Sequence, residues 1–329
     1  MASLNQNSSE SFTSGIEYNC NKTQEAIFLV LYAVVGIVMF FGNSFVCVVF
    51  LASRKLRHSF MNMFLLSLSA SDILMAAFVI PFYTVHCFRD CPHSLTSYCW
   101  LLRKARDFVL AATTLNICAI TYDRFLAILR PLQYGAKMTR LRVGVILTAV
   151  WLIPAVVAAT RNAWNQRTDD NAQRHLKVKL YDTFVVIIPV LLFQIGIVTV
   201  NIQIIRNIHK HEQAAKICGA LHSPDQQKKD LREISRLRKG TTSCVIVVMT
   251  FVICWLPKTV HNFSYIVDSP DPLLSSPLFF RICFIFLFIQ SSFNPFIYTV
   301  YRAQFRKATR DIITRFYLGP KQQKNNSYL

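Results

Sequence analysis

Charged residues are scarce in this chain, and no hydrophilic stretch is long enough for a separate soluble domain. Asp, Glu, Lys and Arg make up 16% of the 329 residues, whereas hydrophobic residues make up 53%. Soluble domains carry about 25% charged residues. Much of the chain must therefore lie in lipid.

Acidic residues are scarcer than basic residues. The chain has 17 Asp and Glu against 36 Lys and Arg, which gives a net charge of +19. We do not expect nucleic acid as a partner, because the basic residues are spread over loops after the first, third, fifth and seventh apolar stretches. Such loops stay in the cytoplasm and face anionic lipid. We expect a multi-pass plasma-membrane protein with its N-terminus outside and membrane lipids among its partners.

Groups of side chains that carry out catalysis are also missing. No set of His, Cys or carboxylate residues forms a nucleophile or metal-ligand pattern, so we do not expect an enzyme. Inverted repeats and paired half-helices, which are typical of transporters, are not visible either. A transporter or channel remains the alternative outside the receptor class.

Seven apolar stretches are present, and each has about 20 residues or more, enough to cross a bilayer as a helix. They centre on Val35, Leu74, Leu115, Trp151, Ile195, Val252 and Leu287. The third is the least apolar, because four charged residues between 103 and 107 interrupt its first turns. The sequence predicts an all-α membrane protein, a seven-transmembrane helix bundle over residues 26–301.

The two ends of the chain carry different signals. Residues 1–25 are expected to form an extracellular arm, glycosylated at Asn7 and Asn21, each of which begins an Asn-X-Ser/Thr sequon. No charged-then-apolar cleavable signal opens the chain, so the first span is expected to act as its own anchor. Residues 302–318 predict a short amphipathic helix on the membrane surface, and residues 319–329 a short cytoplasmic tail.

Two polar interruptions lie near the basic ends of separate spans. Asp-Arg-Phe at 123–125 ends the third span, and Asn-Pro-Phe-Ile-Tyr at 294–298 lies near the end of the seventh. Ionisable residues in membrane helices are costly and mark function. Two such interruptions indicate a bundle that moves, rather than a passive membrane anchor.

With these motifs the chain resembles the rhodopsin-like (class A) G-protein-coupled receptors over residues 26–318. The markers occur in order along seven spans: Gly42-Asn43, Leu68–Asp72, 123–125, Trp151, Pro189, Cys254–Pro257 and 294–298. Each match alone is weak, whereas the ordered set is specific. The resemblance implies a receptor that binds an extracellular ligand and activates a heterotrimeric G protein by outward motion of the sixth helix.

The resemblance also implies roles for the motif residues. Arg124 is expected to pair with Asp123 at rest and to contact the G protein when the sixth helix moves. Pro residues inside helices remove a backbone hydrogen bond and leave a kink. The expected activation switch consists of Trp255, Pro257, Asn294, Pro295 and Tyr298.

Asp72 is a carboxylate inside the second span, and in similar receptors its surroundings hold Na⁺. The expected ligands are Asp72, Asn43, Thr113, Gln290 and Asn294. Gln290 stands where the family usually has Asn or Ser, so the alternative is a site without an ion. Asp72 would then be protonated or hydrogen-bonded to Asn294. No other cofactor is expected.

Four Cys residues lie on the expected extracellular side: Cys20, Cys87, Cys91 and Cys99. The family pairs the Cys at the head of the third span with the second extracellular loop, but residues 161–180 contain no Cys. Three full pairings remain open. One of them joins Cys91 to Cys99, which closes the shortest plausible loop, and leaves Cys20 for Cys87.

The ligand anchors of two small-ligand classes are missing. Amine receptors carry an Asp seven residues after the third-span Cys, where this chain has Arg106 followed by Asp107; retinal-binding relatives carry a Lys where it has Phe288. Candidate ligand-binding residues are instead Tyr83, Arg103, Arg106, Asp107, Lys258, His261, Asn262, Tyr265 and Arg281.

Lys258 directly follows Pro257, and a buried ammonium there needs a carboxylate. That carboxylate comes from the ligand or from Asp107. We therefore expect a peptide, or a ligand with an anionic group; a small-amine receptor is the alternative. An alternative explains these charges equally well: an internal ion pair of Asp107 with Arg106 or Lys258, without contact to a ligand.

Overall fold

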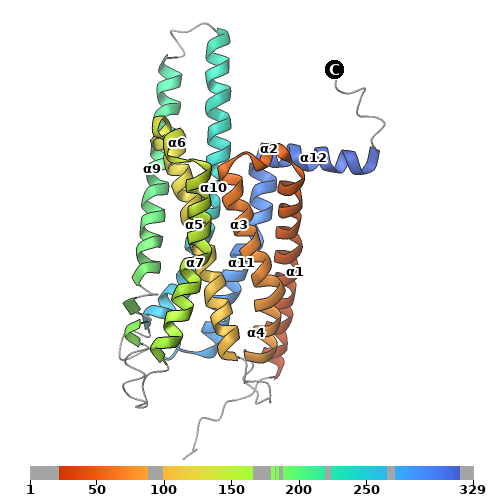
Figure 1. Ribbon diagram of the computed structural model, residues 1–329, viewed down its shortest axis with the longest axis vertical. Helices are drawn as coiled ribbons and strands as arrows, with labels where there is room; N and C mark the ends of the chain where they lie inside the picture. The colour runs from red at the N-terminus through yellow and green to blue at the C-terminus, as the bar shows by residue number, and fades with distance from the viewer. Residues whose placement is uncertain are drawn as a thin grey trace, which may run out of the picture.

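The chain folds as a bundle of long helices, which Figure 1 shows side by side. The computed structural model describes residues 22–87, 99–165, 179–181, 183–184, 188–218, 224–264 and 271–318. The helices are α1 (Lys22–Ala52), α2 (Arg54–Arg57), α3 (Phe60–Leu74), the π-helical η1 (Met75–Val79), α4 (Ile80–Cys87), α5 (Cys99–Leu129), α6 (Pro131–Lys137), α7 (Arg140–Asn165), α9 (Ile188–Cys218), α10 (Pro224–Ser264), α11 (Pro277–Tyr301) and α12 (Ala303–Leu318).

Six described helical segments are long and apolar enough to cross a membrane: Lys22–Ala52, Phe60–Phe82, Arg140–Thr160, Ile188–Lys210, Val245–Ser264 and Pro277–Tyr301. The remaining long helix of the bundle is α5, whose first turns carry the charged residues noted above. It is 31 residues long and contacts α3, α4, α7, α9 and α10. The protein is thus an all-α, seven-helix bundle, and its most polar span lies among the others.

The outer surface of the bundle is apolar, as a lipid environment requires. On α1, Val30 and Phe41 are exposed, whereas Met39 and Val46 are fully buried. Polar groups turn inward instead: Asn43, on the same helix, is buried. This inside-out distribution agrees with the prediction that most of the chain lies in lipid.

The second span changes its winding near its middle. The π-helical turn Met75–Val79 separates α3 from α4, and Pro81 follows directly. Pro81 has no N–H to donate to the carbonyl of Ala77, and its ring would clash there in a regular α-helix. The wider turn relieves that clash, and the span continues to Cys87.

α1 and α11 approach closely at Gly42. A Cβ atom at this position would lie 2.9 Å from Cγ and 3.3 Å from Cβ of Pro295. Only glycine fits between the two helices here, so this marker of the first span is explained by packing.

One end of the bundle carries α12, and α9 and α10 project beyond the bundle at this same end (Figure 1). We call it the α12 end. Phe305 of α12 is fully buried, with its ring 5.5 Å from the ring of Phe50 and 6.2 Å from that of Phe45, both on α1. These contacts fix the predicted C-terminal amphipathic helix across the end of the bundle.

Candidate functional site

Away from the α12 end, Arg106 and Asp107 form an internal ion pair on α5. The Nε of Arg106 donates to Oδ1 of Asp107 at 2.9 Å, and its second nitrogen lies 2.7 Å from the same oxygen. The Arg106 side chain is buried, with its guanidinium 4.9 Å from the ring centroid of Phe284, whereas the Asp107 side chain is 41% exposed. The internal pair left open by the sequence is therefore formed with Arg106, and Asp107 keeps an exposed face.

Lys258 lies opposite on α10 and rests on aromatic rings. Its Nζ is 4.6 Å from the ring centroid of Phe280 and 5.6 Å from that of Phe284. It lies within electrostatic range of Arg106 and Asp107, yet among the described residues it makes no ion pair. Contact with aromatic faces offsets only part of the cost of burying an ammonium group.

Two other predicted ligand-binding residues, His261 and Arg281, are buried and contact neighbouring helices and loops. His261 is buried, its Nδ1 lies 2.8 Å from the carbonyl oxygen of Leu274, and its ring is 5.1 Å from that of Phe280. Arg281 is also buried, and its backbone carbonyl accepts a hydrogen bond of 2.8 Å from the Tyr32 hydroxyl. Both residues therefore have packing contacts within the bundle, and their role in ligand binding stays a prediction.

The remaining predicted ligand-binding residues are less constrained. Arg103 is exposed at the start of α5, and Asn262 is half-buried on α10. Tyr83 lies on α4, but its side chain is outside the described part, as is all of Tyr265. Their roles stay predictions.

The predicted switch residues line the centre of the bundle. Trp255 is buried, with its ring 5.1 Å from that of Phe251, and its Nε1 has no hydrogen-bond partner among the described residues. Pro257 lies inside α10 and Pro295 inside α11, while Tyr298 is buried. A ring held by packing alone can repack, which is compatible with a switch.

The Asp72 carboxyl is joined to α11 by one predicted partner. Asn294 donates from Nδ2 to Oδ2 of Asp72 at 2.9 Å. Thr113 instead shares a hydrogen bond of 3.2 Å with Ser71. The hydrogen bond to Asn294 is thus present, whereas Thr113 is bonded to a neighbour of Asp72.

Two of the predicted sodium ligands, Asp72 and Asn43, have side-chain oxygens with spare bonding capacity. Oδ1 of Asp72 and Oδ1 of Asn43 are buried without a hydrogen-bond partner among the described residues. Nε2 of Gln290 is also buried without such a partner. Asn43 uses its Nδ2 for the carbonyls of Met39 and Ser291, at 3.0 and 3.3 Å. The two oxygens suit a hard cation, whereas the Gln290 amide nitrogen does not. Sodium binding stays a prediction.

At the α12 end, Asp123 and Arg124 pair on α5. Arg124 donates from Nε to Oδ2 of Asp123 at 2.9 Å and also from its terminal nitrogen. The Asp123 side chain is fully buried, and its Oδ1 accepts a hydrogen bond of 2.9 Å from Tyr134 on α6. Burial, together with the adjacent Asp123 carboxylate, raises the pKa of Tyr134 to about 12. Arg124 and Tyr134 thus hold Asp123 from two sides.

Residues 42–298 match the family model of the 7 transmembrane receptor (rhodopsin family). The chain belongs to this family. Members are receptors, so this chain is a membrane receptor that binds a ligand and couples to a G protein, and it is not an enzyme.

Several receptors of this family are similar to the chain along most of its length. It is 26% identical to the human (Homo sapiens) 5-hydroxytryptamine receptor 4, over 89% of this chain and 80% of that receptor. It is 25% identical to the trace amine-associated receptor 8b of Rattus norvegicus, over 91% of each chain. The D(5)-like dopamine receptor of Takifugu rubripes is 28% identical over 83% of this chain and 63% of its own length.

Sequence reasoning missed two polar contacts in this receptor. Tyr134 lies eleven residues after Asp123, and only the Pro131 that opens α6 indicates that the chain turns back there. Thr259 of α10 and Gln194 of α9, 3.1 Å apart, tie these helices together, and no motif marks either residue.

Some predicted sites of the receptor lie outside the described residues. These are the sequon residues Asn7 and Asn21, and Cys20 and Cys91. Cys87 ends α4 and Cys99 begins α5, but their side chains belong to the undescribed part. Glycosylation and the disulfide pairing stay predictions.

Proposed function

We propose that this receptor lies in the plasma membrane with its N-terminus outside, and that it binds a small extracellular ligand between α5, α10 and α11. Ligand binding then moves α10 and exposes Arg124 at the α12 end to a heterotrimeric G protein. The basic loops at that end support this orientation. The observation that carries the ligand proposal is Lys258, a half-buried ammonium without an ion pair among the described residues.

The relatives favour a small amine over the peptide expected from the sequence. Their printed names refer to 5-hydroxytryptamine, trace amines and dopamine. In this chain the carboxylate available to a ligand ammonium is that of Asp107, which is part-exposed and shared with Arg106. A simple amine that binds Asp107 would also be repelled by two nearby positive charges, those of Arg106 and Lys258.

Lys258 supplies the second half of the argument. An acidic group on the ligand would give this ammonium the counter-ion that it lacks, while an amine on the same ligand faces Asp107. The ligand class that fits both charges is a small zwitterion, such as an amino acid or a close derivative. A simple amine bound through Asp107 is the second candidate.

Matched pairs of compounds test this proposal. Tyrosine is compared with tyramine, and tryptophan with tryptamine, because each pair differs only in a carboxylate. Nucleotide exchange on a purified G protein is measured with the receptor in nanodiscs. We expect the amino acid of a pair to be at least tenfold more potent. Charge-assisted contacts contribute about 1.5–3 kcal/mol, so Lys258→Met should lower its potency about 10- to 100-fold.

Two further variants serve as controls. Lys258→Arg keeps the charge and should retain most of the potency, and Asp107→Asn should weaken both members of a pair. Potent amines that are insensitive to Lys258→Met would support the second candidate. Activation by acidic peptides alone would support the peptide ligand that the sequence predicts.

A further inference from the structure

The charges around Lys258 do not balance. Arg106 and Asp107 of α5 and His261 of α10 are ionisable groups within its electrostatic range. Arg106 already holds the carboxylate of Asp107, with contacts of 2.9 and 2.7 Å to the same oxygen. Protonation of His261 could only add positive charge, and the nearby thiol of Cys283 is uncharged at pH 7. Among the described residues, one positive charge is therefore left without a counter-ion.

Aromatic rings hold this ammonium but do not neutralise it. The Nζ of Lys258 is 4.6 Å from the ring centroid of Phe280 and 5.6 Å from that of Phe284. The guanidinium of Arg106 is 4.9 Å from the Phe284 centroid, so two cations share one ring. Ring faces attract cations through a quadrupole and carry no net charge. An uncompensated charge in a bundle surrounded by lipid is costly.

A small solute can reach this ammonium from outside the bundle. Lys258 is half-buried, and its Nζ is not one of the fully buried polar atoms of the described residues. From Lys258 to Ser264, where α10 ends, is about 9 Å along the helix axis. This end lies away from the α12 end, on the side that we propose to be extracellular.

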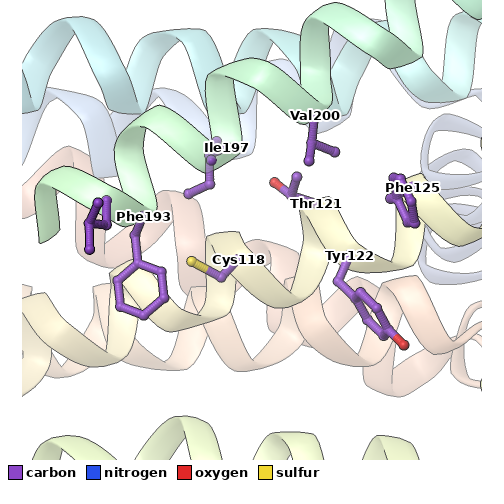
Figure 2. Close-up of a pocket in the computed structure, with 9 residues that line it drawn as sticks. Cys118, Thr121, Tyr122, Phe125, Phe193, Ile197 and Val200 are labelled. Atoms are coloured by element: carbon purple, nitrogen blue, oxygen red, sulfur yellow. The ribbon is translucent and has the colours of Figure 1, made fainter. Parts of the chain in front are cut away.

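Two other places in the bundle suit an anion less well. Arg124 is paired with Asp123. The groove of about 330 Å³ between α5 and α9, which Figure 2 shows, is lined by uncharged side chains such as Cys118, Thr121 and Phe193. Lys258 therefore offers the better-placed positive charge.

The surroundings of Lys258 favour a small monovalent anion. A single unbalanced charge needs one negative charge, and the cost of dehydrating an ion increases steeply with its charge. Chloride is monovalent, makes no directional demands on its donors and is abundant outside cells, where the ionic strength is about 0.15 M. A site of only millimolar affinity would thus be filled.

We propose that Lys258 binds chloride from the extracellular solution whenever no acidic group of a ligand occupies that position. The site is part of the pocket of the proposed function, but chloride binding to the ligand-free receptor does not depend on which ligand class is right. A ligand carboxylate would compete with chloride. A simple amine at Asp107 would instead bind together with chloride, because the anion offsets one of the two positive charges that repel it.

Thermal unfolding of the ligand-free, full-length receptor in nanodiscs tests chloride binding directly. Sodium chloride replaces sodium gluconate, a bulky and strongly hydrated anion, at a constant ionic strength of about 0.15 M. An ion that binds only the folded state stabilises it, so chloride should raise the thermal midpoint saturably, by about 2–4 °C.

Matched variants identify the binding position. Lys258→Met and Lys258→Gln should lose the difference between the two salts, whereas Lys258→Arg keeps the charge and should retain it. Lys137→Met removes a lysine at an exposed position of α6 and should also retain the difference. The midpoint of each variant in gluconate verifies that it folds.

The nucleotide-exchange assay gives a second readout, with opposite signs for the two kinds of ligand. Replacing gluconate by chloride should lower the potency of tyrosine about threefold to tenfold by competition. It should raise the potency of tyramine by about fivefold, because chloride and the amine favour each other's binding. Both effects should disappear in Lys258→Met.

Three results would overturn the proposal: equal midpoints of the wild-type receptor in chloride and gluconate, a chloride effect that persists in both Lys258→Met and Lys258→Gln, or equal changes in potency for tyrosine and tyramine. Equal midpoints together with a preference for tyrosine would refute chloride binding and leave the zwitterionic ligand in place. A saturable, Lys258-dependent chloride effect together with a preference for tyramine would support chloride binding and refute the zwitterion.

Discussion

At the scale of single residues, Arg124 is the side chain whose loss should separate signalling from folding. Its side chain is 17% exposed and pairs with Asp123 on its own helix. We expect Arg124→Ala to abolish ligand-stimulated nucleotide exchange while surface expression, measured by antibody binding, stays near that of the wild type. Arg130→Ala, at an exposed position of the same end, is the control. A variant that reaches the surface and signals normally would contradict the coupling role.

Tyr134 holds Asp123 from the other side, and its hydroxyl can be removed alone. Tyr134→Phe deletes the hydrogen bond to Oδ1 of Asp123 and leaves the ring in place. We expect ligand-free nucleotide exchange to rise by up to about tenfold, which corresponds to about 1.4 kcal/mol. Tyr301→Phe, at an exposed position, should leave the rate unchanged. An unaltered rate in Tyr134→Phe would mean that this bond does not hold the resting form.

The Tyr134 contact also has a defined pH dependence. The pKa of Tyr134 is raised to about 12, above the value of about 10 for an unfolded chain. Its contribution to stability is therefore complete below pH 10 and is lost as the pH rises from about 10 to about 12. Between pH 6 and 9, the difference in ligand-free exchange between wild type and Tyr134→Phe should stay constant; a difference that changes there would point to another titrating group.

At the scale of helices, the α1–α11 contact depends on the absence of a side chain at Gly42. A methyl group there would lie 2.9 Å from Pro295, and overpacking of this kind costs about 1–3 kcal/mol. Gly42→Ala should therefore lower the thermal midpoint of the purified receptor by about 2–6 °C. Gly144→Ala meets nothing within 4 Å and should not lower it. Equal midpoints for the two variants would contradict the close approach.

Helix positions were largely predictable, because hydropathy over about 20 residues reports directly on the membrane. Residues 302–318 were also predicted as a helix, and α12 covers Ala303–Leu318. Contacts between helices were harder to predict from the sequence, because they depend on how each helix is rotated about its axis. Thr113 bonds to Ser71 rather than to Asp72, although Ser71 and Asp72 are adjacent in the same sequence motif. The π-helical turn before Pro81 was missed because hydropathy does not register winding.

The candidate ligand site shows the same limit. The charges at Arg106, Asp107 and Lys258 were readable, but their pairing was not, because Asp107 could serve either cation. The structure pairs Asp107 with Arg106, its neighbour in sequence. His261 and Arg281 were grouped with the ligand residues by charge, and the contacts of His261 with Leu274 and of Arg281 with the Phe28 ring could not be read from the sequence.

At the scale of the whole molecule, the orientation in the membrane can be tested by glycosylation. Asn7 and Asn21 begin sequons near one terminus, and Asn325-Asn326-Ser327 forms another near the other terminus. Sequons are modified only on the extracellular side. We expect Asn7→Gln with Asn21→Gln to lower the apparent mass as much as enzymatic removal of N-glycans does, and Asn325→Gln to have no effect. The reverse pattern would place the N-terminus inside.

The length of α10 has a mechanical consequence. Pro257 divides its 41 residues into an arm of about 10 Å toward Ser264, beside the ligand site, and an arm of about 50 Å toward Pro224, beyond the α12 end (Figure 1). If the helix pivots near Pro257 as a stiff rod, a displacement of about 1 Å at the short arm becomes about 5 Å at the far tip. A ligand that shifts the end of the short arm near Ser264 by less than a bond length can thus produce a displacement at the tip as large as a side chain. The amplification lies in the unequal arms, so shortening the projecting part of α10 would reduce the reach of the movement without touching the ligand site.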